Sequence, residues 1–145
     1  MGIWFKPFSV DDLNAYQQQT LVSHLGIRYT EVGDDFLSAS MPVDARTKQP
    51  AGILHGGASV ALAETLGSTG ANLVVDRDKY LCVGLDINAN HVRSMKNGTV
   101  TGTARALHRG STTPVWEIKI EDEKQRLVCV SRITMAVLDR SKIGN

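Results

Sequence analysis

The sequence predicts an α+β domain in which an antiparallel sheet wraps around one long helix. The stretch from about residue 57 to 74 is small or apolar on nearly all sides, as is typical of a helix enclosed by other elements. Segments in which apolar and polar residues alternate follow it, separated by polar turns. A helix followed by such strands is the pattern of an α+β fold. The four predicted strands lie near residues 81–93, 98–108, 112–121 and 126–138.

The residues before this helix predict a short helix and two further strands. Ser9 stands three residues before Asp12, a spacing typical of a capped helix start. We expect the two strands near residues 25–32 and 35–42. Because 145 residues are the size of one domain, we expect residues 1–145 to form a single domain.

The composition is ordinary for a globular protein, with 42% hydrophobic and 21% charged residues. The formal net charge of +1 comes from Lys and Arg scattered among Asp and Glu, which argues against a nucleic-acid partner. No apolar run approaches the length of about 18 residues that a membrane span needs, so we expect no membrane partner. Because neither secretion nor membrane spanning is expected, we predict a cytoplasmic protein. Cys82 and Cys129 lie in apolar segments, which predicts buried, reduced thiols.

The most informative segment is the glycine pair Gly56 and Gly57, which precedes Glu64 by two helical turns. Glycines let a ligand come close to the backbone, and the free N–H groups of a helix start bind an anion or a carbonyl oxygen. Gly57, Glu64 and Ser68 share one helix face. A carboxylate among small and apolar neighbours is costly unless it is used, so we interpret Glu64 as a general base or a nucleophile and not as a surface residue.

Six segments carry motifs of a known family, namely Met41–Asp44, Arg46–Pro50, Leu54–Ser59, Leu62–Ser68, Val83–Arg93 and Leu107–Gly110. In these motifs the chain resembles the hotdog-fold acyl-CoA thioesterases. Within them it is most similar to the group that hydrolyses aromatic acyl-CoA thioesters, including 1,4-dihydroxy-2-naphthoyl-CoA in menaquinone synthesis, and to its proofreading relative in enterobactin synthesis. The resemblance implies that the sheet is the curled hotdog sheet and that Glu64 is the catalytic carboxylate.

The resemblance also implies roles for three residues before Glu64. Gln49 matches a glutamine beside the reacting thioester, and the backbone N–H of Gly56 matches a donor that polarises the thioester carbonyl. His55 adjoins the glycine pair, where it either contacts the substrate or braces its own turn. We expect Glu64, Gln49, Gly56 and His55 to form the catalytic group.

A second set of residues is expected to bind substrate. Ser68 can hydrogen-bond the carboxylate or a water, or bond back to the carbonyl of Glu64. By period two, residues 83, 85, 87, 89, 91 and 93 lie on one side of their strand. His91 and Arg93 at its far end border the acyl and CoA channel in the family, although a solvated strand end explains them nearly as well. His108, Arg109, Gly110 and Ser111 can hold the CoA phosphates or form a plain β-turn.

Other chemistries lack their signatures. Ser59 has no nucleophile elbow around it, the four histidines show no metal-ligand spacing, and no glycine-rich phosphate loop is present, so we expect no metal and no cofactor. Three hypotheses remain: an acyl-CoA thioesterase, a hotdog-type enoyl-CoA hydratase or dehydratase, and a non-catalytic acyl-CoA binding protein.

The resemblance finally implies an oligomer. In the family two subunits join their sheets, so that Gln49 and Gly56 of one chain face Glu64 of the other, and dimers pair into homotetramers. An exposed sheet edge, which is normally paired or covered, agrees with this. The acyl group does not follow from the residues, and Ala51 stands where relatives tend to carry an aromatic residue.

Overall fold

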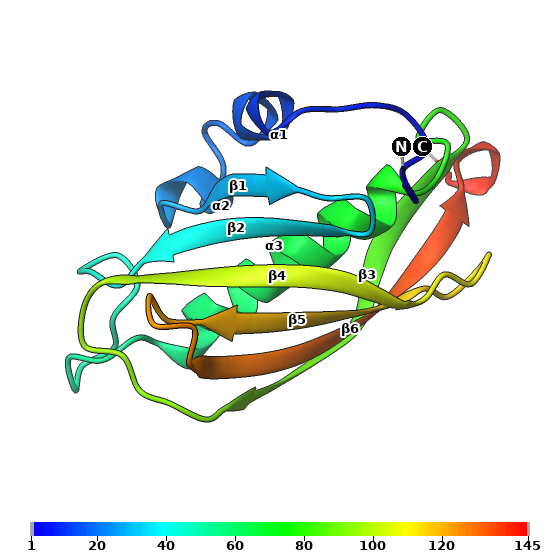
Figure 1. Ribbon diagram of the computed structural model, residues 1–145. Helices are drawn as coiled ribbons and strands as arrows, with labels where there is room; N and C mark the ends of the chain where they lie inside the picture. The colour runs from blue at the N-terminus through cyan, green and yellow to red at the C-terminus, as the bar shows by residue number, and fades with distance from the viewer. Residues whose placement is uncertain (1, 145) are drawn as a thin grey trace.

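The computed structural model describes residues 2–144, in which a six-stranded antiparallel sheet curves around a long helix (Figure 1). The strand order is β1-β2-β4-β5-β6-β3, so that β1 and β3 are the two edges. The strands are β1 (Arg28–Val32), β2 (Phe36–Pro42), β3 (Tyr80–His91), β4 (Thr99–His108), β5 (Val115–Glu121) and β6 (Leu127–Asp139).

The long helix is α3 (Gly56–Leu73), and two short helices, α1 (Val10–Tyr16) and α2 (Leu21–His24), lie beside β1 in Figure 1. Ser9 caps α1 as predicted, because its hydroxyl accepts the N–H of Asp12 and its own N–H donates to the Asp12 carboxylate. The long helix, the first helix and all six predicted strands are confirmed to within a few residues at their ends. Helix α2 and a 3-10 turn at Arg140–Lys142 were not predicted.

Helix α3 approaches the sheet closely because the contact positions are small. A Cβ atom on Gly67 would lie 2.4 Å from Cγ2 of Ile133, and one on Gly70 would lie 2.8 Å from the ring of Trp116. Leu62 and Leu66 fill the remaining space and are fully buried. Burying a leucine side chain contributes roughly 2 kcal/mol, so this seam holds α3 in a fixed rotation and decides which of its faces stays open.

The edge strand β3 differs from the period-two prediction. Its pairing with β6 shifts between Gly84 and Asp86, so Leu85 is an extra residue of a β-bulge. Gly84 therefore faces α3 together with His91 farther along the strand. The prediction that residues 83 and 85 share a side with 87, 89 and 91 is wrong, because a bulge resets the alternation. The strand also ends at His91, so Arg93 lies beyond it.

A curved antiparallel sheet that encloses one long helix is a hotdog fold, as the resemblance implied. The two edges differ in how they are covered. Helix α1 packs against β1, whereas no strand among residues 2–144 pairs with the outer edge of β3. Leu85 on that edge is 62% exposed. Cys82 and Cys129 are buried free thiols, as predicted, and burial raises the pKa of each.

Candidate active site

The start of α3 keeps one backbone donor free. His55 is the N-cap residue, and its Nδ1 accepts the N–H of Gly57 at 2.8 Å. The N–H groups of Ala58 and Ser59 both donate to the carbonyl of His55. Among residues 2–144, the N–H of Gly56 is therefore the one first-turn donor without a partner. A lone backbone N–H at a helix start is suited to a carbonyl oxygen or an oxyanion.

The tautomer of His55 follows from the same contact. A backbone N–H can only donate, so Nδ1 of His55 must carry a lone pair and no proton. In the neutral ring the proton then resides on Nε2, which is left as a donor. The structure thus assigns His55 to bracing its own turn, while its second nitrogen adds another N–H at the start of α3.

Gln49 adds a third donor from a small hairpin that leads into α3. Its N–H donates to the carbonyl of Ile53 at 2.9 Å, and the turn passes through Gly52, whose φ of 80° favours glycine. The side-chain Oε1 of Gln49 accepts the N–H of Ala51 at 2.5 Å. The amide NH₂ of Gln49 therefore points away from its own loop and can donate to a ligand.

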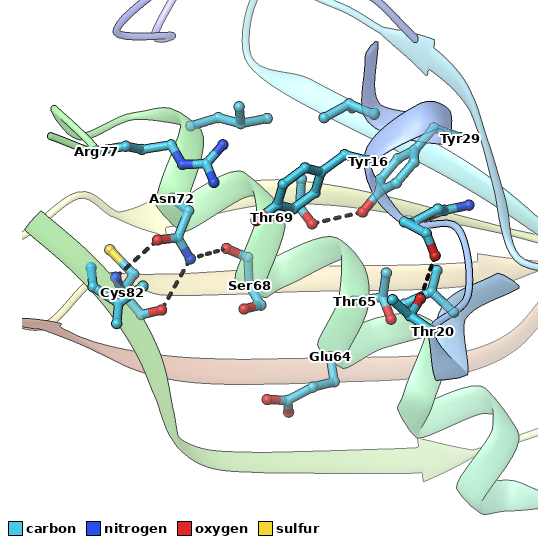
Figure 2. A pocket seen from close by; sticks show the side chains of 15 residues that line it. Tyr16, Thr20, Tyr29, Glu64, Thr65, Ser68, Thr69, Asn72, Arg77 and Cys82 are labelled. Atoms are coloured by element: carbon cyan, nitrogen blue, oxygen red, sulfur yellow. Dashed lines mark hydrogen bonds between the residues drawn. The ribbon is translucent and has the colours of Figure 1, made fainter. Parts of the chain in front are cut away.

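The side chain of Glu64 differs from those of His55 and Gln49, because it makes no bond to the local backbone within residues 2–144. Its carboxylate extends from α3 toward β3 (Figure 2), where a Cβ atom on Gly84 would lie 2.7 Å from its Oε1. No hydrogen bond or ion pair joins it to another side chain or backbone group within residues 2–144. Glu64 is half-buried, and this burial raises the pKa of its carboxyl above the ordinary value. A carboxylate in such surroundings is suited to accept a proton or to attack a carbonyl.

A pocket of about 480 Å³ opens beside Glu64, between α3 and the segment of α1 and α2 (Figure 2). Ser68 lines this pocket, and among the described residues its hydroxyl bonds neither the carboxylate nor the backbone carbonyl of Glu64. The carbonyl of Ser68 also accepts the side-chain NH₂ of Asn72 at 2.9 Å. Thr65, Thr69 and Asn72 continue the same wall.

Sequence reasoning missed a buried polar pair in this pocket. The hydroxyl groups of Tyr29 and Thr69 lie 2.6 Å apart. Burial raises the pKa of Tyr29, and the bond to Thr69 partly opposes that rise. The helical period that joined Glu64 to Ser68 points to Thr69 and Asn72 as well. No local pattern places Tyr29 there, because it comes from β1.

The predicted substrate residues fall into two groups. His91 lies against the start of α3, since a Cβ atom on Gly56 would be 3.0 Å from its Nε2. The turn from His108 to Ser111 joins β4 to β5 at the other end of the sheet in Figure 1. The start of β4 lies near the loop before α3, because Val43 donates to the carbonyl of Gly98. His108, Arg109, Gly110 and Ser111 are thus not brought beside Glu64 or Gly56 within one chain.

The residues that are predicted to be catalytic are also separated. Gly56 and Glu64 lie eight residues apart on one straight helix. At a rise of about 1.5 Å per residue, this places them about 12 Å apart along the axis. A single carbonyl group cannot contact both. The predicted catalytic residues of one chain therefore form two separate groups, which we call half-sites: a donor group (Gln49, His55 and Gly56) and a carboxylate group (Glu64 with the pocket).

Two further observations bear on function. No helix among residues 2–144 is long and apolar enough to cross a membrane. Over the same described range, no three His, Cys, Asp or Glu side chains are grouped so that they can hold a metal ion.

Comparison with known proteins identifies the class of this fold and site. A family model described as the thioesterase superfamily matches residues 51–129. A Vibrio cholerae protein described as an esterase is 61% identical over 137 residues, which are 94% of this chain and 91% of that protein. The 1,4-dihydroxy-2-naphthoyl-CoA hydrolase of Escherichia coli is 52% identical over 136 residues, covering 94% of this chain and 99% of the hydrolase.

The solved structure of a Haemophilus influenzae thioesterase superimposes with a TM-score of 0.95 at 45% identity and covers 99% of both chains. The chain belongs to the thioesterase superfamily. It is a thioester hydrolase with the hotdog fold, and the enzyme class implied by the resemblance is confirmed.

Proposed function

We propose that this protein hydrolyses acyl-CoA thioesters with aromatic acyl groups, to the free acid and CoA. The observation that carries the proposal is the half-buried, unpartnered carboxylate of Glu64 beside an open pocket. The pocket offers both apolar walls, such as Leu13 and Leu73, and hydroxyl groups. Similarity to a hydrolase of 1,4-dihydroxy-2-naphthoyl-CoA supports an aromatic acyl group and a place in menaquinone synthesis.

In the proposed reaction the Gly56 N–H donates to the thioester carbonyl oxygen and stabilises the negative charge that develops there. Removing one such donor typically costs about 10²- to 10³-fold in rate. Gln49 and His55 supply further N–H groups beside it. The carboxylate of Glu64 takes a proton from water as the water oxygen bonds to the carbonyl carbon. The carbon–sulfur bond then breaks, and the thiolate of CoA takes up the proton.

An alternative course uses Glu64 as the nucleophile. Its oxygen then bonds to the carbonyl carbon, CoA leaves as the thiolate, and the resulting mixed anhydride is hydrolysed by water to restore the carboxylate. Both courses need Glu64 ionised, and both need an oxyanion donor. They differ in whether an acyl-enzyme forms.

A second copy of the chain completes the site in this proposal. Glu64 and Gly56 of one chain are about 12 Å apart along α3, so the donor group of one subunit faces the carboxylate of its neighbour. The open edge of β3 offers a surface along which two sheets can join. We propose a cytoplasmic homotetramer, built as a dimer of such dimers.

The remaining predicted residues take their places in that assembly. His91, which lies against Gly56, borders the thioester, and Arg93 just beyond β3 is a CoA contact. The CoA phosphates are held by the turn that contains His108, Arg109, Gly110 and Ser111. This turn lies at an end of the sheet that is distant from Glu64 of the same chain. Ser68 contributes its unpartnered hydroxyl to the acyl group or to water.

The tautomer of His55 weighs against the hydratase hypothesis. A hydratase of this fold needs a histidine that accepts a proton, but the Nδ1 lone pair of His55 is already used by the N–H of Gly57. The remaining nitrogen, Nε2, bears the proton and donates. The geometry of His55 is that of a carbonyl-binding group.

The test is thiol release from a panel of aromatic and aliphatic acyl-CoA thioesters by the wild type and by Glu64→Ala. We expect fast turnover of an aromatic member and a loss of about 10²- to 10⁴-fold in the variant, with the fold intact by circular dichroism. Turnover that survives the loss of Glu64 would overturn the mechanism. Loss of the crotonyl-CoA enoyl absorbance without thiol release would identify a hydratase, and tight binding of every ester without turnover would identify a binding protein.

A further inference from the structure

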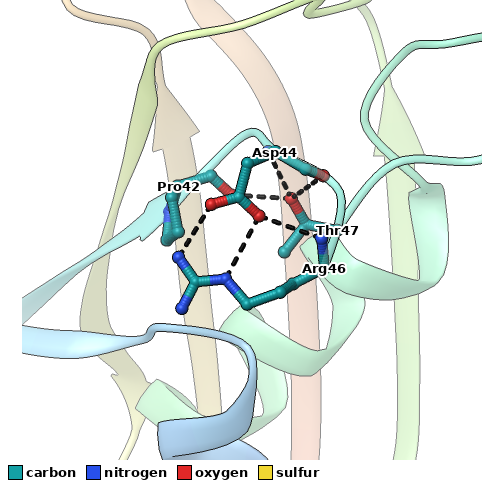
Figure 3. A network of polar contacts seen from close by, with 4 residues as sticks. All are labelled: Pro42, Asp44, Arg46 and Thr47. Carbon is teal, nitrogen blue, oxygen red and sulfur yellow. Dashed lines mark hydrogen bonds and ion pairs between the residues drawn. The ribbon is translucent and has the colours of Figure 1, made fainter.

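Thr47 is a loop residue that is almost completely removed from solvent. It lies between β2 and α3 and is only 1% exposed, although loop residues usually lie on the surface. Its hydroxyl donates to the carbonyl of Pro42 at 2.7 Å and accepts the N–H of Asp44 at 3.1 Å (Figure 3). A buried hydroxyl with both a donor and an acceptor contact fixes the backbone around it.

The backbone of Thr47 makes the second connection. Its carbonyl accepts the N–H of His55 at 2.8 Å. His55 is the N-cap of α3, and the residue after it is Gly56, whose N–H is free. The peptide plane that carries the Gly56 N–H begins at the carbonyl of His55. The bond from His55 to Thr47 therefore restrains the direction in which that donor points.

The other end of the connection is anchored in the sheet. Pro42 is the last residue of β2 and pairs with Thr99 of β4. The N–H of Val43 donates to the carbonyl of Gly98 at 2.8 Å. Thr47 thus links a fixed strand end, through its hydroxyl, to the N-cap of the long helix, through its carbonyl. No other residue of the 43–55 loop joins these two elements in this way.

The neighbouring ion pair does not make the same link. Arg46 and Asp44 lie 2.7 Å apart, but their side chains are 47% and 42% exposed. Arg46 also donates its backbone and side-chain N–H groups to the same carboxylate. An exposed pair that closes on itself contributes little to holding distant elements. The burial of Thr47, not the charge beside it, distinguishes the link.

We propose that Thr47 is a positioning residue for thioester hydrolysis, which holds the Gly56 N–H in line for the oxyanion by tying the N-cap His55 to the end of β2. This inference rests on the proposed function, in which that N–H stabilises the transition state. Thr47 touches neither the substrate nor the reacting atoms. Its contribution is pre-organisation, so its loss acts on the chemical step more than on binding.

The test compares Thr47→Val with Thr47→Ser and with a matched control. Valine keeps the branched shape and removes the hydroxyl, whereas serine keeps the hydroxyl. The control is Thr103→Val, because the Thr103 hydroxyl makes a similar bond, at 2.9 Å to Ser38, between β2 and β4. The measurements are kcat and KM for the best acyl-CoA substrate, thermal unfolding, and hydrogen exchange of the peptide that contains His55 and Gly57.

We expect Thr47→Val to lose about 10- to 100-fold in kcat, with KM changed less than about threefold, because misplacing a catalytic donor acts in the transition state. Exchange at His55 should rise in this variant alone. Thr47→Ser should recover most of kcat. The control should lose stability to a similar degree without the loss in kcat.

A Thr47→Val enzyme with wild-type kcat, or with kcat reduced only as much as in Thr103→Val, would overturn the inference. So would an unchanged exchange rate at His55. Glu64→Ala, assayed in parallel, separates this failure from that of the proposed function. If Glu64→Ala is inactive and Thr47→Val is not, only the positioning role fails. If neither variant loses activity, the proposed mechanism itself fails.

Discussion

The donor group lies at the start of α3 and in the loop before it, and the carboxylate group lies two turns along the helix. The two groups are built in opposite ways. At the donor end, His55 and Gln49 each use one atom to bind the local backbone, at 2.8 Å and 2.5 Å respectively. These bonds decide which of their remaining atoms face outward. Glu64 has no hydrogen bond or ion pair with any group in residues 2–144, and Gly84, which faces it from β3, has no side chain.

In the proposed mechanism this difference explains how each half-site obtains its reactivity. Oxyanion donors act best when they do not need to reorganise, so they are fixed by the chain before any ligand arrives. A carboxylate gains basicity when hydrogen bonds and cations are withheld from it, because such partners stabilise its charged form. Fixing Glu64 with an arginine or a serine would lower its pKa and make it a weaker base. The lack of bonding partners around Glu64 therefore matters as much for its proposed basicity as the hydrogen bonds around Gly56 matter for the position of the donor.

The prediction with the largest expected effect concerns whether the two half-sites of one active site belong to different chains. Gln49→Ala disables the donor group and Glu64→Ala disables the carboxylate group, so either variant alone should be nearly inactive. Co-expressed with different tags, they should form mixed dimers that contain one intact site. Random pairing makes about half of the dimers mixed, so about a quarter of all sites are restored in the unfractionated mixture. In the mixed dimers themselves about half of the sites are intact.

The measurement is thiol release by the doubly tagged fraction after two affinity steps. As the control, the double variant Gln49→Ala/Glu64→Ala is co-expressed with wild type, which leaves no intact shared site in a mixed dimer. If the mixture of Gln49→Ala and Glu64→Ala has no activity, both groups act within one chain. That result would contradict the separation of about 12 Å along α3, which follows from a rise of about 1.5 Å per residue.

Much of the difference between the two groups can be predicted from the sequence. The long helix and the strands follow from period and turn residues, and Glu64 stands out as a carboxylate among small neighbours. The glycine pair marks the helix start because only a helix N-terminus leaves backbone N–H groups free. Which of those groups stays free was not predictable, since it depends on the ring nitrogen that His55 turns toward Gly57.

Other features depend on distant parts of the chain. The bulge at Leu85 brings Gly84 to face Glu64, and a strict alternation along β3 hides this contact. Tyr29 lines the pocket because its hydroxyl extends from the edge strand β1 to Thr69 of α3. The role of Thr47 as a link is likewise invisible, because a threonine in a polar loop resembles a surface residue until its burial is known. Local patterns carry none of these contacts.

A smaller effect is expected from filling the space opposite the carboxylate. In Gly84→Ala the new Cβ would lie 2.7 Å from Oε1 of Glu64, too close for the carboxylate to stay in place. Gly84 is exposed, so stability should change by no more than about 0.5 kcal/mol. We expect kcat to fall about 10-fold, because even a small displacement of a catalytic group lowers the rate of the chemical step.

The control for this variant is Asp86→Ala, which alters an exposed residue on the other side of the same edge strand. Equal losses in the two variants would assign the effect to the β3 edge and not to Glu64. A Gly84→Ala enzyme with unchanged kcat would show that the bare surroundings of the carboxylate are not required.

The smallest expected effect is on the free energy of unfolding, which the unpartnered carboxylate of Glu64 lowers. Because burial raises the pKa of Glu64 above its ordinary value of 4.5, the native state holds the proton more tightly than the unfolded chain does. Ionisation at neutral pH therefore opposes folding. Glu64→Gln removes that cost, so its unfolding midpoint should exceed that of the wild type at every pH above the native pKa. The gain should shrink as the pH falls through the native pKa toward 4.5.

Thermal unfolding across this range, with the exposed Glu31→Gln as the control, gives the comparison. A wild type that is the more stable of the two at neutral pH would mean that Glu64 has a stabilising partner, and the contrast between the two half-sites would then be lost.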